Sequence, residues 1–130
     1  MAQKEIEVIL TRQLASYLAV PIILIDAAGT LLFYNEPAEV IVGRRFEETG
    51  ELSADEWAQL LVVTDEHGTP LAPERRPMLI ALTERRPVHG ELWGQGLGHV
   101  RKHVEITAFP LIGQAGRQLG AVAIFWEVKQ

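Results

Sequence analysis

Residues 29–43 read GTLLFYNEPAEVIVG, and this stretch decides the fold. Residues 30–34 are mostly apolar or aromatic and predict a strand that follows a glycine turn. Asn35 stands where the strand ends, and its side-chain amide can bind nearby backbone groups as a turn or cap; we favour this structural role over contact with a ligand. Residues 36–42 suit a short helix, and Gly43 suits its C-terminal end. The stretch therefore predicts a strand that leads directly into a small helix.

A helix and a further strand are predicted ahead of this stretch. Residues 21–26 form a short run rich in β-branched residues that ends at the turn DAAG, so this run and residues 30–34 predict a hairpin. Between residues 4 and 20, apolar residues recur at spacings of three and four, which predicts an amphipathic helix that stops before Pro21. These residues are Ile6, Ile9, Leu10, Leu14, Tyr17 and Leu18.

Short helices and then a meander of strands are predicted in the rest of the chain. Ser53 and Glu56 form a capping box that starts one helix, and Pro77 starts another, which Pro87 closes. Three strand-like segments follow, at residues 88–93, 100–110 and 119–128. The predicted fold class is α+β, with a five-stranded antiparallel sheet, short helices on one face and the N-terminal amphipathic helix flanking the other. We divide the chain into residues 1–20, the helix, and residues 21–130, the sheet domain.

Both faces of the last predicted strand are apolar, so a cover is needed on each side of the sheet. The short middle helices can cover one face. The N-terminal helix, from its own chain or from a partner chain, can cover the other. Its stripe of Ile6, Leu10, Leu14 and Tyr17 is therefore either a dimer interface or the intramolecular cover of the sheet, and the sequence leaves both alternatives open.

Composition excludes several function classes. The 130 residues are 48% apolar, which is enough for one core, and the longest apolar runs are too short to span a bilayer. A net charge of −5 disfavours binding to nucleic acid or to an anionic membrane. No signal peptide is visible, because Lys4, Glu5 and Glu7 interrupt the start of the chain. We therefore expect a soluble, cytoplasmic domain.

The pattern resembles a PAS domain, the small α+β sensory module of signalling proteins. Residues 29–43 look like that family's motif of a glycine, a strand, an asparagine, a small helix and a closing glycine, although Pro37 stands where alanine or glutamine is common. Residues 65–71, 76–82 and 86–88 are similar to the linker and long helix that precede the third strand in many PAS domains. The resemblance spans about residues 21 to 128.

The resemblance implies a non-catalytic sensor that signals through dimer contacts to a partner or an attached output domain. Its interior pocket holds haem, flavin, a small metabolite or nothing, so the cofactor is unknown. The absence of cysteine excludes the flavin type that forms a cysteine adduct. Haem is disfavoured because residues 76–86 contain no histidine, while a ligand from His89, His99 or His103 is left open.

Candidate ligand-binding residues follow from the apolar stripes of the middle helices and from strand parity. They are Trp57, Leu61, Met78, Leu82, Lys102, Val104 and Ile106. Lys102 shares strand parity with Val104 and Ile106 and could face an acidic ligand. The alternative, which we favour, is a lysine at a strand end that extends its amine to water.

Other candidate chemistry has simpler explanations. His99 and His103 have helical metal-ligand spacing, but on a strand they would lie about 13 Å apart, so we expect no metal site. The loop at 94–98 is followed by a strand rather than the helix that a phosphate loop needs. The acidic residues Glu47, Glu48, Glu51, Asp55 and Glu56 are expected on a solvated surface.

The sequence therefore predicts a sensory domain that dimerises and holds a small ligand. The alternatives are a ligand-free interaction module and, less favoured, a small enzyme, for which no catalytic constellation is visible.

Overall fold

The structure, a computed structural model, describes residues 5–96 and 101–128 of the chain. The five α-helices of this part are α1 (Ile6–Tyr17), α2 (Glu36–Val42), α3 (Phe46–Thr49), α4 (Ala54–Leu60) and α5 (Pro77–Glu84). Two 3₁₀ turns are η1 (Pro73–Arg75) and η2 (Gln114–Gly116). The strands are β1 (Ile22–Asp26), β2 (Leu31–Tyr34), β3 (Val62–Thr64), β4 (Val88–Gln95), β5 (Arg101–Ile112) and β6 (Gln118–Glu127). None of the helices described is long and apolar enough to cross a membrane.

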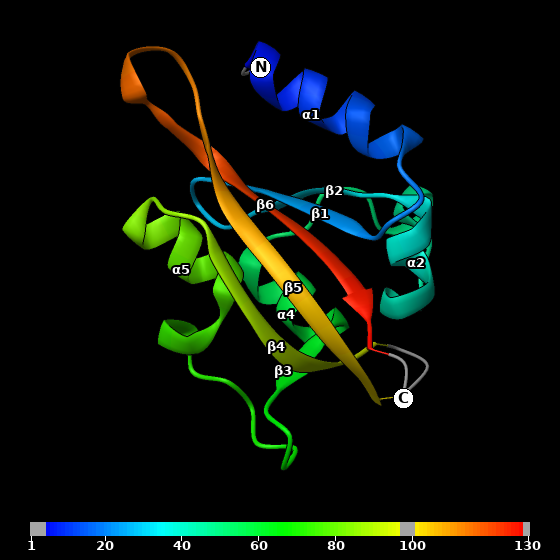
Figure 1. Cartoon of the computed structure of the whole chain (residues 1–130). Coiled ribbons are helices and arrows are strands. Elements are labelled where there is room, and N and C mark those ends of the chain that lie inside the picture. The colour runs from blue at the N-terminus through cyan, green and yellow to red at the C-terminus, as the bar shows by residue number, and fades with distance from the viewer. Residues whose placement is uncertain (1–4, 97–100, 129–130) are drawn as a thin grey trace.

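The strands form one antiparallel sheet in the order β2-β1-β6-β5-β4-β3 (Figure 1). This confirms the predicted α+β class, the hairpin and the C-terminal meander. The predicted count of five strands is wrong by one, because β3 adds a sixth at the edge. Its three residues are too few to show an alternating pattern, and pairing with β4, as in Val62 opposite Gln95, defines this strand. Helix α3, a single turn, was likewise not predicted.

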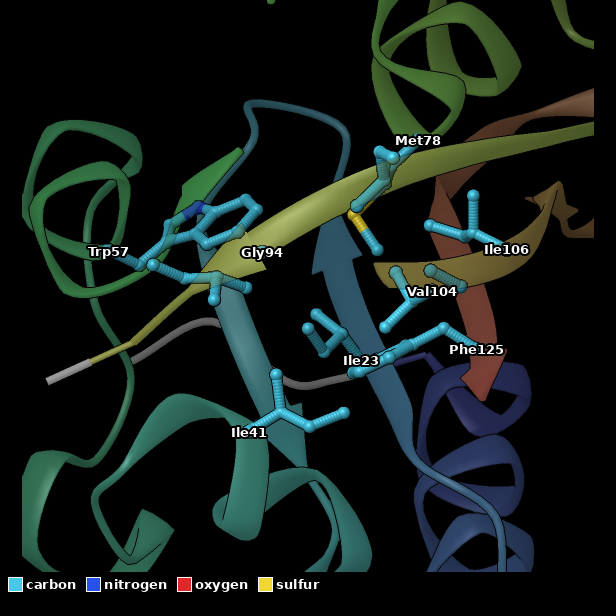
Figure 2. Close-up of a pocket in the computed structure, with 11 residues that line it drawn as sticks. Ile23, Ile41, Trp57, Met78, Gly94, Val104, Ile106 and Phe125 are labelled. Atoms are coloured by element: carbon cyan, nitrogen blue, oxygen red, sulfur yellow. The ribbon is translucent and has the colours of Figure 1, made fainter. Parts of the chain in front are cut away.

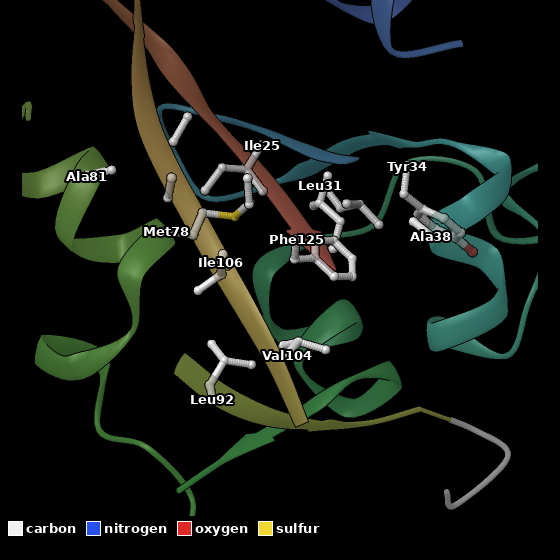
Figure 3. Close-up of a cluster of buried hydrophobic side chains, with 14 of the residues drawn as sticks. Ile25, Leu31, Tyr34, Ala38, Met78, Ala81, Leu92, Val104, Ile106 and Phe125 are labelled. Carbon is white, nitrogen blue, oxygen red and sulfur yellow. The ribbon is translucent and has the colours of Figure 1, made fainter. Parts of the chain in front are cut away.

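The sheet lies between two unequal layers. Figure 1 shows α1 on one side and α4 and α5 on the other. On the inner side, buried residues of β1, β4, β5 and β6 pack against α2, α4 and α5 in the main core, part of which is drawn in Figure 3. On the outer side, Val8 and Ala15 of α1 pack over Ile22, Leu24 and neighbouring residues. Each sheet face therefore has a helical cover, as the apolar last strand required.

The apolar stripe of α1 does not cover the sheet. Ile6, Leu10, Leu14 and Tyr17 are 64%, 55%, 59% and 87% exposed. Of the two alternatives that the sequence left open for this stripe, its exposure is inconsistent with the intramolecular cover. Val8 and Ala15, on the opposite side of the helix, are buried and make that contact.

Asn35 joins the two layers. Its side chain is buried, and its Oδ1 accepts hydrogen bonds from the backbone N–H groups of Ile22 (2.9 Å) and Ala38 (3.2 Å). Its Nδ2 donates to the carbonyl oxygens of Ala15 (3.0 Å) and Val20 (2.8 Å). One side chain thus caps α2, anchors the end of α1 and fixes the start of β1. The structural interpretation of Asn35 is confirmed.

Candidate functional site

A cavity of about 60 Å³ lies on the inner side of the sheet, between the strands and helices α2, α4 and α5. Figure 2 shows the labelled side chains arranged around a common space. Its lining consists of Ile23, Ile41, Trp57, Leu61, Met78, Leu92, Gly94, Val104, Ile106, Ala123 and Phe125. The cavity is thus lined by strands β1, β4, β5 and β6, by helices α2, α4 and α5, and by Leu61, which follows α4.

Helix α4 brings Trp57 to the cavity wall. Its N-terminus is held by the predicted capping box, in which Ser53 Oγ accepts from Glu56 N (3.2 Å) and Glu56 Oε1 accepts from Ser53 N (2.9 Å). The hydrogen bond from the Ser53 backbone lowers the pKa of Glu56 from its ordinary value. Trp57 Nε1 donates to the carbonyl oxygen of Gly29 (3.1 Å) in the β1–β2 turn. This bond orients the indole and ties α4 to the hairpin.

Two glycines of the β4 segment shape the cavity from the opposite wall. A Cβ atom at Gly96 would stand 2.2 Å from the carbonyl oxygen of Ile41, so only glycine lets the end of α2 come this close to the chain after β4. That contact places Ile41 over the cavity. At Gly94 a Cβ would meet Leu61 Cδ1 at 3.7 Å, an ordinary contact. Gly94 thus leaves unfilled a volume that a methyl group would occupy.

The lining residues that the structure describes are apolar. Trp57 carries the one polar side-chain atom among the lining residues, and that atom already donates to Gly29. Among the described residues, the buried side-chain polar atoms that lack a hydrogen-bond partner are His103 Nε2 and Gln118 Oε1. Neither residue lines the cavity. Within residues 5–96 and 101–128, the lining therefore offers dispersion contacts and no charge or free hydrogen-bonding group.

The structure brings five of the seven predicted ligand-binding residues to the cavity: Trp57, Leu61, Met78, Val104 and Ile106. Leu82 and Lys102 do not line it. Leu82 packs against the main core elsewhere, one turn beyond Met78 on α5. Lys102 lies near the start of β5, where its Nζ stands 3.6 Å from Glu127 Oε1, so its amine pairs with a carboxylate at the sheet's end.

Six further lining residues were not named from the sequence: Ile23, Ile41, Leu92, Gly94, Ala123 and Phe125. Alternation along the last strand already placed Ala123 and Phe125 on the same face of the sheet, but it did not decide whether that face was the inner or the outer one. Register with β5, which sets Phe125 opposite Ile106, assigns that face to the interior.

None of the histidines that the structure describes lines the cavity. The ring of His103 stacks on Trp93 at 4.2 Å with an interplanar angle of 5°, and its Nε2 lies 3.6 Å from Glu91 Oε2. His89 lies on the same outer face of the sheet as His103, and its ring centre is 6.1 Å from that of Trp126. Neither is placed to reach a ligand in the cavity, and His99 lies outside the described residues. Within those residues no group of three His, Asp or Glu side chains could hold a metal.

The acidic residues around α3 and α4 are exposed, as expected. These are Glu47, Glu48, Glu51, Asp55 and Glu56. Glu47 pairs with Arg45 at 2.8 Å on the surface. Their arrangement supplies no buried carboxyl pair of the kind that acid–base catalysis uses.

No protein-family model matches the sequence, and no curated protein matches it. Solved structures do match. The PAS domain of BvgS from Bordetella pertussis is similar at a TM-score of 0.63 and 14% identity, over 95% of this chain and 87% of that chain. The PAS domain of nitrogen regulation protein NR(II) from Vibrio parahaemolyticus has a TM-score of 0.65 and 14% identity, over 92% and 98%. The LOV protein of Rhodobacter sphaeroides has a TM-score of 0.73 and 16% identity, over 97% and 70%.

Proposed function

The chain has the PAS fold, and on that premise we propose that it is a sensory signalling domain that dimerises through α1 and binds a small ligand in its interior. The observation that carries this proposal is the cavity between the inner sheet face and the helices. A ligand that prefers one packing of these elements over another shifts their population, and this shift is the signal. The recipient is a partner protein or an attached output domain.

The link from cavity to surface runs through α4 and Asn35. Trp57 contacts the cavity on one side and bonds Gly29 of the hairpin on the other. The same hairpin leads through β2 to Asn35, which holds the end of α1. A change in packing at Trp57 therefore has a continuous route to the helix that we assign to dimerisation.

Dimerisation through α1 is supported by the exposure of its apolar stripe. The helix is already held on its own sheet by Val8 and Ala15, and by the guanidinium of Arg12, which lies 4.8 Å from the Phe33 ring centre. The stripe of Ile6, Leu10, Leu14 and Tyr17 faces away from these contacts. A contiguous exposed apolar stripe of this kind usually marks an interaction surface. A second copy of the chain presents the same stripe and can bury it symmetrically.

The dimer is tested by the double substitution Leu10→Glu and Leu14→Glu. We expect monomers at micromolar concentration by multi-angle light scattering, because two buried carboxylates would face their symmetry mates without partners. Ser16→Glu adds charge to the same helix outside the stripe and should leave the dimer intact. An unchanged mass for the double variant, with an unchanged circular dichroism spectrum, would contradict the assignment.

A ligand-free interaction module is the second candidate, and the small volume of the cavity favours it. Pockets for drug-sized molecules usually measure roughly 300–1,000 Å³, whereas this one measures about 60 Å³. Native mass spectrometry with an absorbance spectrum separates the two candidates. A dimer carrying a nonprotein mass supports the sensor, and a clean dimer that no small molecule stabilises supports the module.

A further inference from the structure

We propose that the inner cavity selects a small, uncharged, apolar molecule, smaller than benzene, and recognises it by shape alone. This inference rests on the proposed ligand-sensing function and names the ligand class of that same site. Three observations carry it: the chemistry of the lining, the volume of the cavity and the absence of a side chain at Gly94.

The lining excludes charged and strongly polar ligands. A carboxylate, phosphate or amide that entered would leave its hydration behind and find no partner, since the lining is aliphatic or aromatic and the Trp57 N–H is committed to Gly29. An unpaired buried polar group is strongly disfavoured, and an unpaired charge much more so. Lys102, the candidate cation from the sequence, does not line the cavity and is paired with Glu127. Polar metabolites and acidic ligands are therefore selected against.

The volume sets an upper limit on size. An apolar cavity of about 150 Å³ stays dry and binds benzene or xenon. The cavity in this chain measures about 60 Å³. The cavity is open on one side. Because protein interiors are close-packed, a ligand larger than the cavity must displace the wall or project through that opening, where it loses contact with the lining. The space suits a dissolved gas or a molecule of a few heavy atoms, and benzene exceeds it.

Two glycines of β4 offer a matched pair of variants. Gly94 lines the cavity and Gly90 does not. A Cβ at Gly94 would lie 3.7 Å from Leu61 Cδ1, and one at Gly90 would lie 3.6 Å from Pro77 Cγ, so both alanines fit as ordinary contacts. The two substitutions add the same methyl group to the same strand. They differ in whether that methyl group occupies the cavity.

The experiment measures xenon binding by amide chemical shifts under xenon pressure, in the full chain and in Gly94→Ala and Gly90→Ala. We expect saturable shifts centred on the lining residues in the full chain and in Gly90→Ala. In Gly94→Ala we expect affinity to fall about tenfold or more, because the added methyl group overlaps the ligand. Equal xenon affinity in both alanine variants would overturn the assignment of the site.

Benzene and benzoate test size and charge. We expect neither to bind the full chain, and benzene alone to bind Met78→Ala, in which the wall is cut back. Leu61→Ala is the second enlarged variant, should Met78→Ala fail to fold. Benzene binding to the full chain as tightly as xenon would overturn the size limit.

The outcomes also separate this inference from the proposed function. If benzoate binds the full chain and xenon does not, the ligand class is wrong while ligand sensing survives. If none of the three probes binds the full chain, both fail and the chain is a ligand-free module. Xenon binding that only Gly94→Ala weakens supports both.

Discussion

The Asn35 junction and the inner cavity both involve strand β1 and helix α2, yet they are built on opposite principles. At the junction, one buried amide makes four hydrogen bonds to α1, the α1–β1 segment, β1 and α2. In the cavity, the 11 lining residues among those described surround an incompletely filled space and supply no free polar side-chain group. Hydrogen bonds in a dry interior are directional and fix a single geometry. Dispersion contacts are individually weak and nondirectional, so the cavity wall can be repacked.

The comparison teaches where this domain is rigid and where it can respond. The junction holds the end of α1 and the start of α2 in one arrangement, so α1 cannot shift without breaking buried hydrogen bonds. The side chains around the cavity can repack without breaking hydrogen bonds. The sensory function that we propose needs both a responsive region and a rigid connection that carries the change to the surface.

The largest expected effect comes from Asn35→Ala. The substitution removes the side-chain partner of the Ile22 N–H and of the Val20 carbonyl oxygen. Ala38 N still donates to the backbone oxygen of residue 35, and the Ala15 carbonyl still accepts from Leu18 N. Since each unsatisfied buried group costs about 1–3 kcal/mol and water can reach some of them, we expect the free energy of unfolding to fall by roughly 3–5 kcal/mol. Urea denaturation measures it. A loss below about 1 kcal/mol would mean that the junction is not the rigid region.

The cavity should respond in the opposite direction. Gly94→Ala fills empty space and restricts the unfolded chain, so we expect stability to rise by about 1 kcal/mol. Gly90→Ala restricts the unfolded chain but fills no cavity, so we expect its stability to rise by about half as much. Urea denaturation of the two variants side by side checks the difference. A destabilised Gly94→Ala with a stable Gly90→Ala would show that the cavity wall is already closely packed.

The smallest effect concerns the pH dependence of stability that Tyr34 produces. Tyr34 is the last residue of β2 and immediately precedes Asn35. Its hydroxyl donates to the carbonyl oxygen of Arg44 (3.0 Å) and lies 3.3 Å from Thr49 Oγ1. Burial raises the pKa of Tyr34 above its ordinary value. The folded state therefore holds this proton more tightly than the unfolded state does. The resulting stability is fully present below the unfolded pKa, near 10, and is lost as pH rises through the folded value.

We expect the free energy of unfolding to decline more steeply above about pH 10 in the natural chain than in Tyr34→Phe. Denaturant titrations at a series of pH values make this comparison. Parallel pH profiles for the two proteins would show that the Tyr34 hydroxyl is solvated in the folded state.

The route from sequence to site succeeded where local rules apply. The capping box at Ser53 and the cap at Asn35 depend on residues a few positions apart, so the sequence specified both. Periodicity selected Trp57, Leu61, Met78, Val104 and Ile106, all of which line the cavity. Lys102 has the same parity but lies too far along β5, because parity assigns a face of the sheet and says nothing about distance along it.

The amino-acid sequence by itself determined the fold class, the hairpin, the helix caps and the apolar character of both sheet faces, because these follow from backbone preferences and from spacing within one segment. Tertiary structure decided the edge strand β3, the volume of the cavity and the face of α1 that meets the sheet. Val8 and Ala15 lie on one side of that helix and Leu10 and Leu14 on the other, and both sides are apolar. Only close packing against a particular surface distinguishes two such sides, since it depends on the shapes of residues far apart in the chain.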